Sequence, residues 1–294
     1  MVIFADDINV SPSMYAKDFF GKNPPPMLAT NGVMSIALKV SKIFGPVYQG
    51  EGPFIGYPAI FVRLAGCNRG NKKMFCDFCD ADFRFAKGQW MDYQFIVATV
   101  DSLATEQGFV KPMVVITGGE PMLQRVPLVN FCNLLLEKGY RVQIESNGDF
   151  SFDGLAGGEK GVFVVVSPKA NPTKDGGTAY NIDWDNLRRA DALKFLVNGD
   201  PNSAYYRLPL GTDNPKFNKL LDDGMVFVSP INYYKKVAAN SDGERIKATS
   251  FWAEGDDQEI DFAATKASYA RAALLVKHRG VRLTVQSHLF GGVE

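Results

Sequence analysis

Short apolar runs alternate with stretches of helical apolar spacing along most of the chain. The runs that predict strands are Ser35–Phe44, Ala59–Leu64, Met113–Ile116, Arg141–Ile144, Val162–Val166, Ala192–Val197, Met225–Val228 and Val281–Val285. Helical spacing predicts helices over Tyr93–Glu106, Val126–Lys138 and Glu259–His278. Asp92 is expected to cap the first helix, and Gly139 and Gly280 to end the other two. Strands that alternate with helices predict an α/β fold with a mostly parallel sheet.

Two segments interrupt this pattern. Gly45-Pro46 is expected to end the first strand. Residues 1–33 contain Ser11-Pro12-Ser13 and Pro24-Pro25-Pro26, with little periodicity, and predict an N-terminal extension with a short helix near Met14–Phe20. Residues 34–294 are expected to form a single core domain, since a chain of this length is enough for one sizeable core.

Polar clusters directly follow four of the predicted strands. They are Cys67, Thr117–Pro121, Glu145-Ser146-Asn147 and Ser167-Pro168-Lys169. In α/β folds the chemistry lies just past the carboxyl ends of the parallel strands. The four clusters therefore predict one functional site at one rim of the sheet.

Three of the four cysteines, Cys67, Cys76 and Cys79, share one loop. Thiolates are the soft ligands that both zinc and iron–sulfur clusters take. Structural zinc uses four ligands, whereas three on a four-iron cluster leave one iron open to a chelating small molecule. On the cysteines alone, both metals stay open.

A fourth protein ligand is hard to find elsewhere in the chain. Cys132 lies on the same predicted helical face as Leu128, Phe131 and Leu135, so we expect it to pack in the core. The two histidines, His278 and His288, come much later in the chain.

The segment Gly118-Gly119-Glu120-Pro121 adds a second feature. Glycines after a buried strand let a ligand approach the main chain closely, and Glu120 offers a carboxylate to an ammonium. Taken alone, the segment is more typical of an ordinary strand-to-helix turn with an acid in its first turn.

Together, the cysteine triplet and this glycine turn resemble the radical S-adenosylmethionine (SAM) superfamily. The resemblance implies an incomplete (β/α) barrel of about six strands, with a four-iron cluster on the three cysteines. The open iron would bind the amino and carboxylate groups of SAM, and one electron from the cluster would release a 5′-deoxyadenosyl radical. One departure is the spacing, because eight residues separate Cys67 from Cys76 where the superfamily commonly has three.

A closer resemblance begins upstream, at about Lys42, and runs to the C-terminus. The sequence resembles the 7-carboxy-7-deazaguanine synthase family in Gln49-Gly50-Glu51-Gly52, Gly56, Phe61–Cys67, Thr117–Pro121, Glu145–Gly148 and Ser167-Pro168-Lys169. Leu193-Lys194-Phe195, Val228-Ser229-Pro230 and Gln286-Ser287-His288 continue the match more weakly. The most specific part of this match is the segment Gln49–Gly52 together with Phe61–Cys67.

This resemblance implies that the chain converts 6-carboxy-5,6,7,8-tetrahydropterin to 7-carboxy-7-deazaguanine with loss of ammonia, a step towards queuosine and other deazapurines. The residues it assigns to the substrate are Gln49, Glu51, Arg63, Thr117 and His288. Those it assigns to the cofactor are Phe78, Gly118, Gly119, Glu120, Ser146, Asn147, Ser167 and Lys169. Arg63 offers a two-pronged donor to the substrate carboxylate. The alternative for Arg63 is an ordinary arginine paired at the surface, and the alternative for His288 is a surface histidine. Gln49 and Glu51 are alternatively plain turn residues.

The family also implies Mg²⁺, held by a Thr or Ser hydroxyl directly after the Cys-x-x-Cys-Asp run. Ala81 stands at that position here. We expect Asp82 or Asp80 to replace the hydroxyl with a hard oxygen, or the dependence on metal to be weakened.

Charge and hydropathy limit the partners. Basic and acidic residues balance at 32 each, which gives no reason to expect a nucleic-acid partner. The acidic N-terminus and the lack of a long apolar run predict a cytoplasmic protein without a membrane span. The resemblance adds an electron donor such as flavodoxin, and a homodimer.

Two alternatives remain open at this stage. Another radical SAM enzyme, such as a glycyl-radical activase, would share the cluster but lack the Gln49–Gly52 segment and Arg63. A non-catalytic, zinc-stabilised binding module would be colourless, whereas an iron–sulfur protein would be brown.

Overall fold

The structure is a computed structural model that describes residues 27–30, 33–69, 76, 78, 79, 88–172, 178–180, 182–210, 213–233 and 261–287. The short helix predicted near Met14–Phe20 lies outside the described residues, as do Ala81, the two candidate magnesium ligands Asp80 and Asp82, and His288.

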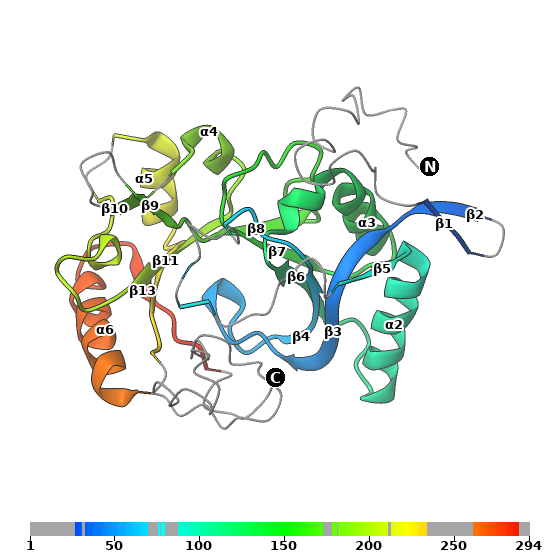
Figure 1. Cartoon of the computed structure of the whole chain (residues 1–294), viewed down its shortest axis with the longest axis horizontal. Helices are drawn as coiled ribbons and strands as arrows, with labels where there is room; N and C mark the ends of the chain where they lie inside the picture. Colours follow the sequence, from blue (N-terminus) through cyan, green and yellow to red (C-terminus); the bar gives the residue numbers. More distant parts are fainter. Residues whose placement is uncertain are drawn as a thin grey trace, which may run out of the picture.

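One large sheet organises the fold, with the strand order β13-β12-β11-β8-β7-β6-β4-β3-β5. Its parallel strands are β4 (Pro58–Leu64), β6 (Met113–Gly118), β7 (Val142–Ser146), β8 (Val162–Val166), β11 (Ala192–Val197), β12 (Val226–Pro230) and β13 (Val281–Leu283). The antiparallel strands β3 (Leu38–Tyr48) and β5 (Gln89–Met91) complete one edge. The sheet bends into an arc that does not close (Figure 1). The predicted incomplete barrel is confirmed, with seven parallel strands among the described residues rather than about six.

The described helices lie on the outside of this arc (Figure 1). They are α2 (Tyr93–Glu106), α3 (Arg125–Glu137), α4 (Trp184–Leu187), α5 (Pro215–Asp222) and α6 (Phe262–Leu275). Helix α2 has the predicted bounds, because the Asp92 carboxylate accepts a hydrogen bond from the Phe95 backbone N–H at 2.8 Å and caps the first turn. Gly139 follows α3 in a left-handed conformation, with φ 81°, as expected of a residue that ends a helix.

The prediction that Gly45-Pro46 ends the first strand was wrong. Strand β3 continues to Tyr48, and the pairing between β3 and β4 shifts register between Phe44 and Val47. A bulge of this kind absorbs residues that cannot join the ladder. A side chain at position 45 would lie 2.7 Å from the Ala59 carbonyl oxygen, so glycine is required there.

The core between the sheet and the helices contains Cys132, as predicted. Its side chain is fully buried together with Leu128, Phe131 and Leu135 of the same helix. Cys132 therefore contributes to packing, which leaves the three cysteines of the loop after β4 as the candidate ligands.

Several small elements were not predicted. The hairpin β1–β2 (Met27–Thr30 and Val33–Ile36) and the hairpin β9–β10 (Ala170–Pro172 and Thr178–Tyr180) are separate from the large sheet. Short 3₁₀ helices occupy Gly52–Phe54, Pro121–Gln124 and Ala204–Tyr206. The proposed boundary at residue 33 falls at the second strand of the first hairpin, and the division into an extension and a core stays a prediction.

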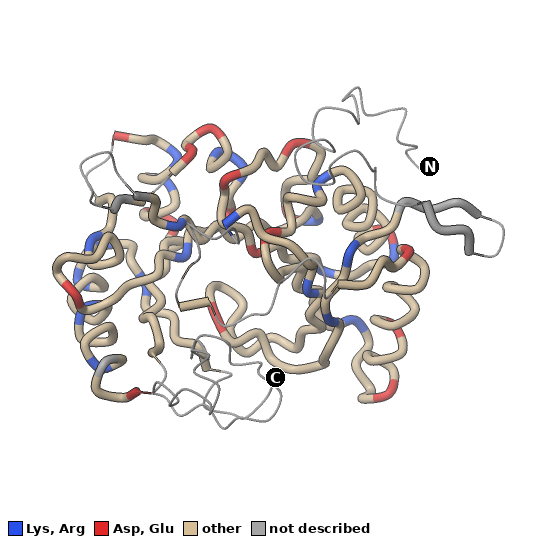
Figure 2. The backbone as a smooth tube through the Cα atoms, in the orientation of Figure 1, with Lys and Arg blue, Asp and Glu red and all other residues tan. Residues whose placement is uncertain are grey.

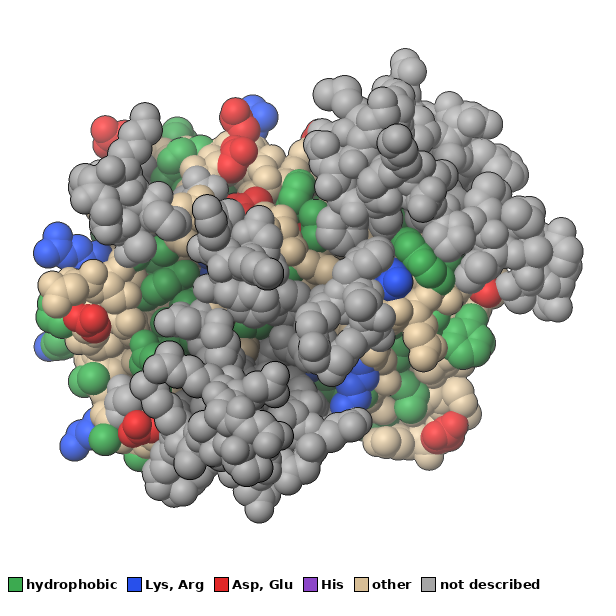
Figure 3. Space-filling view, in the orientation of Figure 1, with side chains coloured by type: hydrophobic (Ala, Val, Ile, Leu, Met, Phe, Trp, Pro, Cys, Tyr) green, Lys and Arg blue, Asp and Glu red, His purple; other side chains and the backbone are tan. Residues whose placement is uncertain are grey.

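Charged residues of both signs are spread along the described backbone (Figure 2) and over its visible surface (Figure 3). No helix in the described part of the chain is long and apolar enough to cross a membrane.

Candidate active site

A cavity of about 240 Å³ lies within the arc of the sheet. It is far larger than the roughly 30 Å³ that a single water occupies. The predicted site residues that line it are Gln49, Glu51, Arg63, Cys67, Cys76, Phe78, Cys79, Thr117, Gly118, Gly119, Ser146, Asn147, Ser167 and Lys169. Glu120 is not among the lining residues, and Asp82 and His288 lie outside the described part of the chain. The polar clusters at the strand ends thus meet around one space.

The three loop cysteines face this cavity together. Cys67 follows β4, and the Cys79 backbone N–H donates to the Cys76 carbonyl oxygen at 3.0 Å. Among the described Cys, His, Asp and Glu side chains, no three converge on a position where a single metal ion would be held. Structural zinc needs four ligands around one ion, whereas an iron–sulfur cluster spreads its thiolates over several irons. Three thiols that line one cavity are the kind of donor set that an iron–sulfur cluster takes.

The cysteines must lose protons when they bind iron. Burial raises the pKa of Cys67 to about 12, although the backbone N–H of Arg69 lowers it. A free thiol at this position is therefore protonated at neutral pH, and metal binding displaces the proton.

The glycine turn packs directly against the cysteine loop. Gly118 has a φ of 117°, and a Cβ there would lie 2.2 Å from the Leu64 carbonyl oxygen. A Cβ on Gly119 would lie 1.9 Å from the Gly66 carbonyl oxygen, an impossible approach. The Glu120 backbone N–H donates to the same Gly66 oxygen at 2.8 Å. The two glycines thus let the end of β6 meet the main chain just before Cys67.

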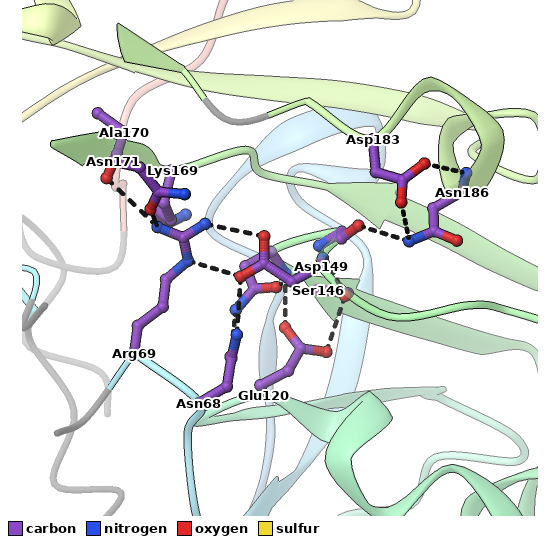
Figure 4. A network of polar contacts seen from close by, with 12 residues as sticks. Asn68, Arg69, Glu120, Ser146, Asp149, Lys169, Ala170, Asn171, Asp183 and Asn186 are labelled. Carbon is purple, nitrogen blue, oxygen red and sulfur yellow. Dashed lines mark hydrogen bonds and ion pairs between the residues drawn. The ribbon is translucent and has the colours of Figure 1, made fainter. Parts of the chain in front are cut away.

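Glu120 is fully buried and turned towards the end of β7 (Figure 4). Its Oε1 accepts hydrogen bonds from the Met122 N–H at 2.9 Å and the Ser146 hydroxyl at 2.8 Å, and its Oε2 accepts one from the Asn147 N–H at 2.7 Å. Burial raises the pKa of Glu120 to about 7 even though these donors lower it. Both carboxylate oxygens already have partners, and direct contact between Glu120 and SAM stays a prediction.

The Lys169 side chain folds back onto Ser167, two residues earlier in the chain. Its ammonium donates to the Ser167 carbonyl oxygen at 2.8 Å and to the Ser167 hydroxyl at 2.7 Å. Burial lowers the pKa of Lys169, and the nearby cations Lys194 and Arg69 lower it further. No described carboxylate forms an ion pair with Lys169. A buried ammonium held by neutral oxygens suits an anionic ligand.

Arg63 and Thr117 occupy paired positions on the adjacent strands β4 and β6, and both line the cavity. The Arg63 guanidinium lies over the Phe44 ring, 4.9 Å from its centroid. Phe44 in turn stacks on Phe61, with ring centroids 5.1 Å apart. This wall of the cavity therefore joins a cation to flat aromatic surface.

Two charged residues that we had not assigned to the site also face the cavity. The Lys194 ammonium donates to Glu51 Oε2 at 2.8 Å and to Glu145 Oε2 at 3.1 Å, and all three side chains are largely buried. Gln49 donates to the other Glu145 oxygen at 3.1 Å. Burial lowers the pKa of Lys194, but the two carboxylates outweigh it and the pKa is raised overall. Glu145 follows the same pattern as Ser146, at the end of an apolar strand, and this signal was available in the sequence.

A second unpredicted group ties down the cysteine loop (Figure 4). Arg69 is buried and holds both oxygens of Asp149, while its third nitrogen donates to Asn171 Oδ1 at 2.7 Å. Asn68 also donates to Asp149, at 2.7 Å, and accepts from Asn147 at 2.8 Å.

The last described residues complete the cavity wall. The Ser287 N–H donates to the Gly50 carbonyl oxygen at 3.2 Å, and the Tyr48 hydroxyl donates to the Ser287 carbonyl oxygen at 2.9 Å. These bonds fix the segment after β13 against the loop after β3. Gln286 consequently lines the cavity beside Glu51.

Comparison with known proteins gives a consistent result. The chain is 34% identical over 279 residues to the 7-carboxy-7-deazaguanine synthase of Rickettsia prowazekii, covering 94% of this chain and 96% of that protein. It is 35% identical over 208 residues to the enzyme of the same name from Hyperthermus butylicus, covering 64% and 84%. The crystal structure of QueE from Escherichia coli shares the fold, with a TM-score of 0.51 and 23% identity over 86% of this chain and 95% of that chain. No family model matches the chain.

Proposed function

The chain belongs to the 7-carboxy-7-deazaguanine synthase family, and we propose that its cavity binds 6-carboxy-5,6,7,8-tetrahydropterin beside SAM on a four-iron cluster. The chain is a radical SAM lyase of 7-deazapurine biosynthesis, and it converts that pterin to 7-carboxy-7-deazaguanine with loss of ammonia. This family membership excludes a glycyl-radical activase and a non-catalytic zinc module.

Cys67, Cys76 and Cys79 would hold the cluster. When bound, the reduced cluster supplies the electron that cleaves SAM, and SAM supplies the radical that removes hydrogen from the pterin. Ser146, Ser167 and the buried Lys169 would hold the polar end of SAM, with Gly118 and Gly119 admitting it close to the main chain. Glu120 fixes the Ser146 hydroxyl and the Asn147 N–H in place, at 2.8 Å and 2.7 Å.

The opposite part of the cavity would hold the pterin. Arg63 offers a fork of donors to the substrate carboxylate, and the Phe44–Phe61 pair beside it offers a flat apolar surface. Glu51 and Gln49 offer oxygen acceptors and amide groups to the pterin edge. Lys194 forms ion pairs with Glu51 and Glu145 and holds both carboxylates in position. A site built from buried polar groups strongly rejects analogues that lack matching groups.

The observation that carries this assignment is that the three cysteines, Arg63 and the Lys194-held carboxylates line the same cavity. The decisive experiment is anaerobic reconstitution with iron and sulfide, followed by turnover of the pterin with SAM and mass spectrometry of the product. A Cys67→Ala variant serves as the control and should lack both the brown colour and the product. Reconstituted protein that contains only zinc, or that consumes SAM without forming the deazaguanine acid, would contradict the proposal.

The magnesium ion is a separate proposal. We propose that Asp82 or Asp80 supplies the hard oxygen that the family takes from a hydroxyl. An Asp82→Ala variant is then expected to need more Mg²⁺ for half-maximal activity. Unchanged activity at limiting Mg²⁺ would remove Asp82 from this role. The electron donor, such as a flavodoxin, and the homodimer belong to the same set of proposals.

A further inference from the structure

Asn232 carries an unexplained polar atom in the cavity wall. It follows β12, lines the cavity together with Glu51 and Gln286, and is 5% exposed. Its Nδ2 donates to Gln286 Oε1 at 2.6 Å. Its Oδ1 is buried and has no hydrogen-bond partner among the residues that the structure describes. Buried carbonyl oxygens are rarely left without a donor, because the lost hydration is costly.

The orientation of the Asn232 amide is fixed by a chain of directional hydrogen bonds that starts at Lys194. The ammonium donates to Glu51, and an ionised carboxylate only accepts hydrogen bonds. Gln286 must therefore present its Nε2 to Glu51 Oε1, at 3.0 Å, and its Oε1 to Asn232. Reversing the Asn232 amide would set two carbonyl oxygens against each other. The unpaired atom at position 232 is thus an acceptor.

We propose that Asn232 is a specificity-determining residue whose Oδ1 accepts a hydrogen bond from an N–H group of the pterin. The inference rests on the proposed function and adds a residue that the sequence motifs did not assign. Oxygen acceptors dominate this part of the wall, since Glu51 and Glu145 lie there as well. An N–H-bearing heterocycle matches such a wall, whereas the substrate carboxylate would be repelled and belongs with Arg63.

The test uses the reconstituted enzyme with SAM and measures dissociation constants for the pterin. A series of analogues, each methylated at one nitrogen, identifies the N–H concerned. Wild type should bind one analogue markedly more weakly than the parent. Asn232→Ala should bind the parent about tenfold more weakly, the worth of one hydrogen bond. It should also discriminate less against that one analogue, while its affinity for SAM is unchanged.

A second variant distinguishes the role of the Asn232 acceptor, Oδ1, from the role of its donor, Nδ2. Asn232→Asp loses the donor to Gln286 but keeps an acceptor, so it should retain the discrimination that Asn232→Ala loses. Asn218→Ala, at an exposed position on α5, is the matched control and should behave as wild type.

The inference would be overturned if Asn232→Ala bound every analogue as wild type does, the result expected when Oδ1 holds only a water. It would also be overturned if both variants lost the same factor for every pterin and for SAM. Failure of the proposed function looks different, because wild type itself would then bind none of the pterins.

Discussion

Arg69 and Asp149 meet side-on through two hydrogen bonds of 2.8 Å, from Nε and Nη2 to the two carboxylate oxygens. Arg69 lies two residues after Cys67, and Asp149 lies just after β7. The pair therefore joins the base of the cysteine loop to the part of the wall that carries Ser146. Because this loop has eight residues between its first two cysteines, a fixed base is valuable for holding Cys76 and Cys79 near Cys67.

Arg69→Gln should lower the free energy of unfolding by about 3–5 kcal/mol, since it leaves the largely buried Asp149 without its cation. The iron content after reconstitution should fall as well. Arg69→Lys keeps the charge but not the fork, and should lie between wild type and Arg69→Gln. Urea unfolding and iron and sulfide analysis measure both effects.

The exposed pair Arg188–Asp185 supplies the control, because Arg188→Gln should change stability by less than about 1 kcal/mol. Wild-type iron content in a destabilised Arg69→Gln protein would show that the pair does not hold the loop.

Lys194→Met should destabilise the protein at neutral pH by about 3–5 kcal/mol, because Glu51 and Glu145 would then be buried without their cation. Pterin binding should weaken strongly at the same time. Lys219→Met removes the cation of an exposed pair with Asp223 and is the control. Equal stability losses for the two variants would contradict the structural role of Lys194.

The sequence predicted those parts of the fold that depend on local patterns. Helix α2 and strands β8 and β11 have the expected bounds, since apolar periodicity and capping are local properties. Strand β3 was cut short in the prediction because Gly45-Pro46 normally breaks a strand. Only the pairing with β4 reveals the bulge that accommodates it.

The candidate site was predictable where side chains follow strand ends, and less so elsewhere. Arg69, Lys194, Asn232 and Gln286 acquire their roles from partners that lie 49 or more positions away in the sequence. No motif of a few residues contains such information. Glu120 shows the converse, because its motif was recognised while its burial and its three donors depended on the fold.

Gly119→Ala should prevent the cysteine loop from packing on the end of β6. The added methyl would lie 1.9 Å from the Gly66 carbonyl oxygen, so the main chain itself must move. Overpacking typically costs about 1–3 kcal/mol and occasionally more. We expect the free energy of unfolding to fall by an amount at the upper end of this range or above it. Gly157→Ala is the matched control, because its nearest neighbour would be the Arg189 side chain at 3.7 Å, an ordinary contact. Thermal unfolding and iron content of the two variants test this, and similar values for both would refute it.

Glu120 should give the protein a characteristic dependence of stability on pH. Burial raises its pKa in the folded state from an ordinary 4.5 to about 7. Between these values the folded protein binds more protons than the unfolded chain, so the free energy of unfolding falls as the pH rises. The contribution of Glu120 to the free energy of unfolding is fully present below pH 4.5 and is lost by about pH 7. Glu120→Gln, which is neutral throughout, should flatten this slope in urea unfolding of cluster-free protein. Glu137→Gln, at an exposed position near the end of α3, should leave it as in wild type, and a slope unchanged by Glu120→Gln would assign the titration to another group.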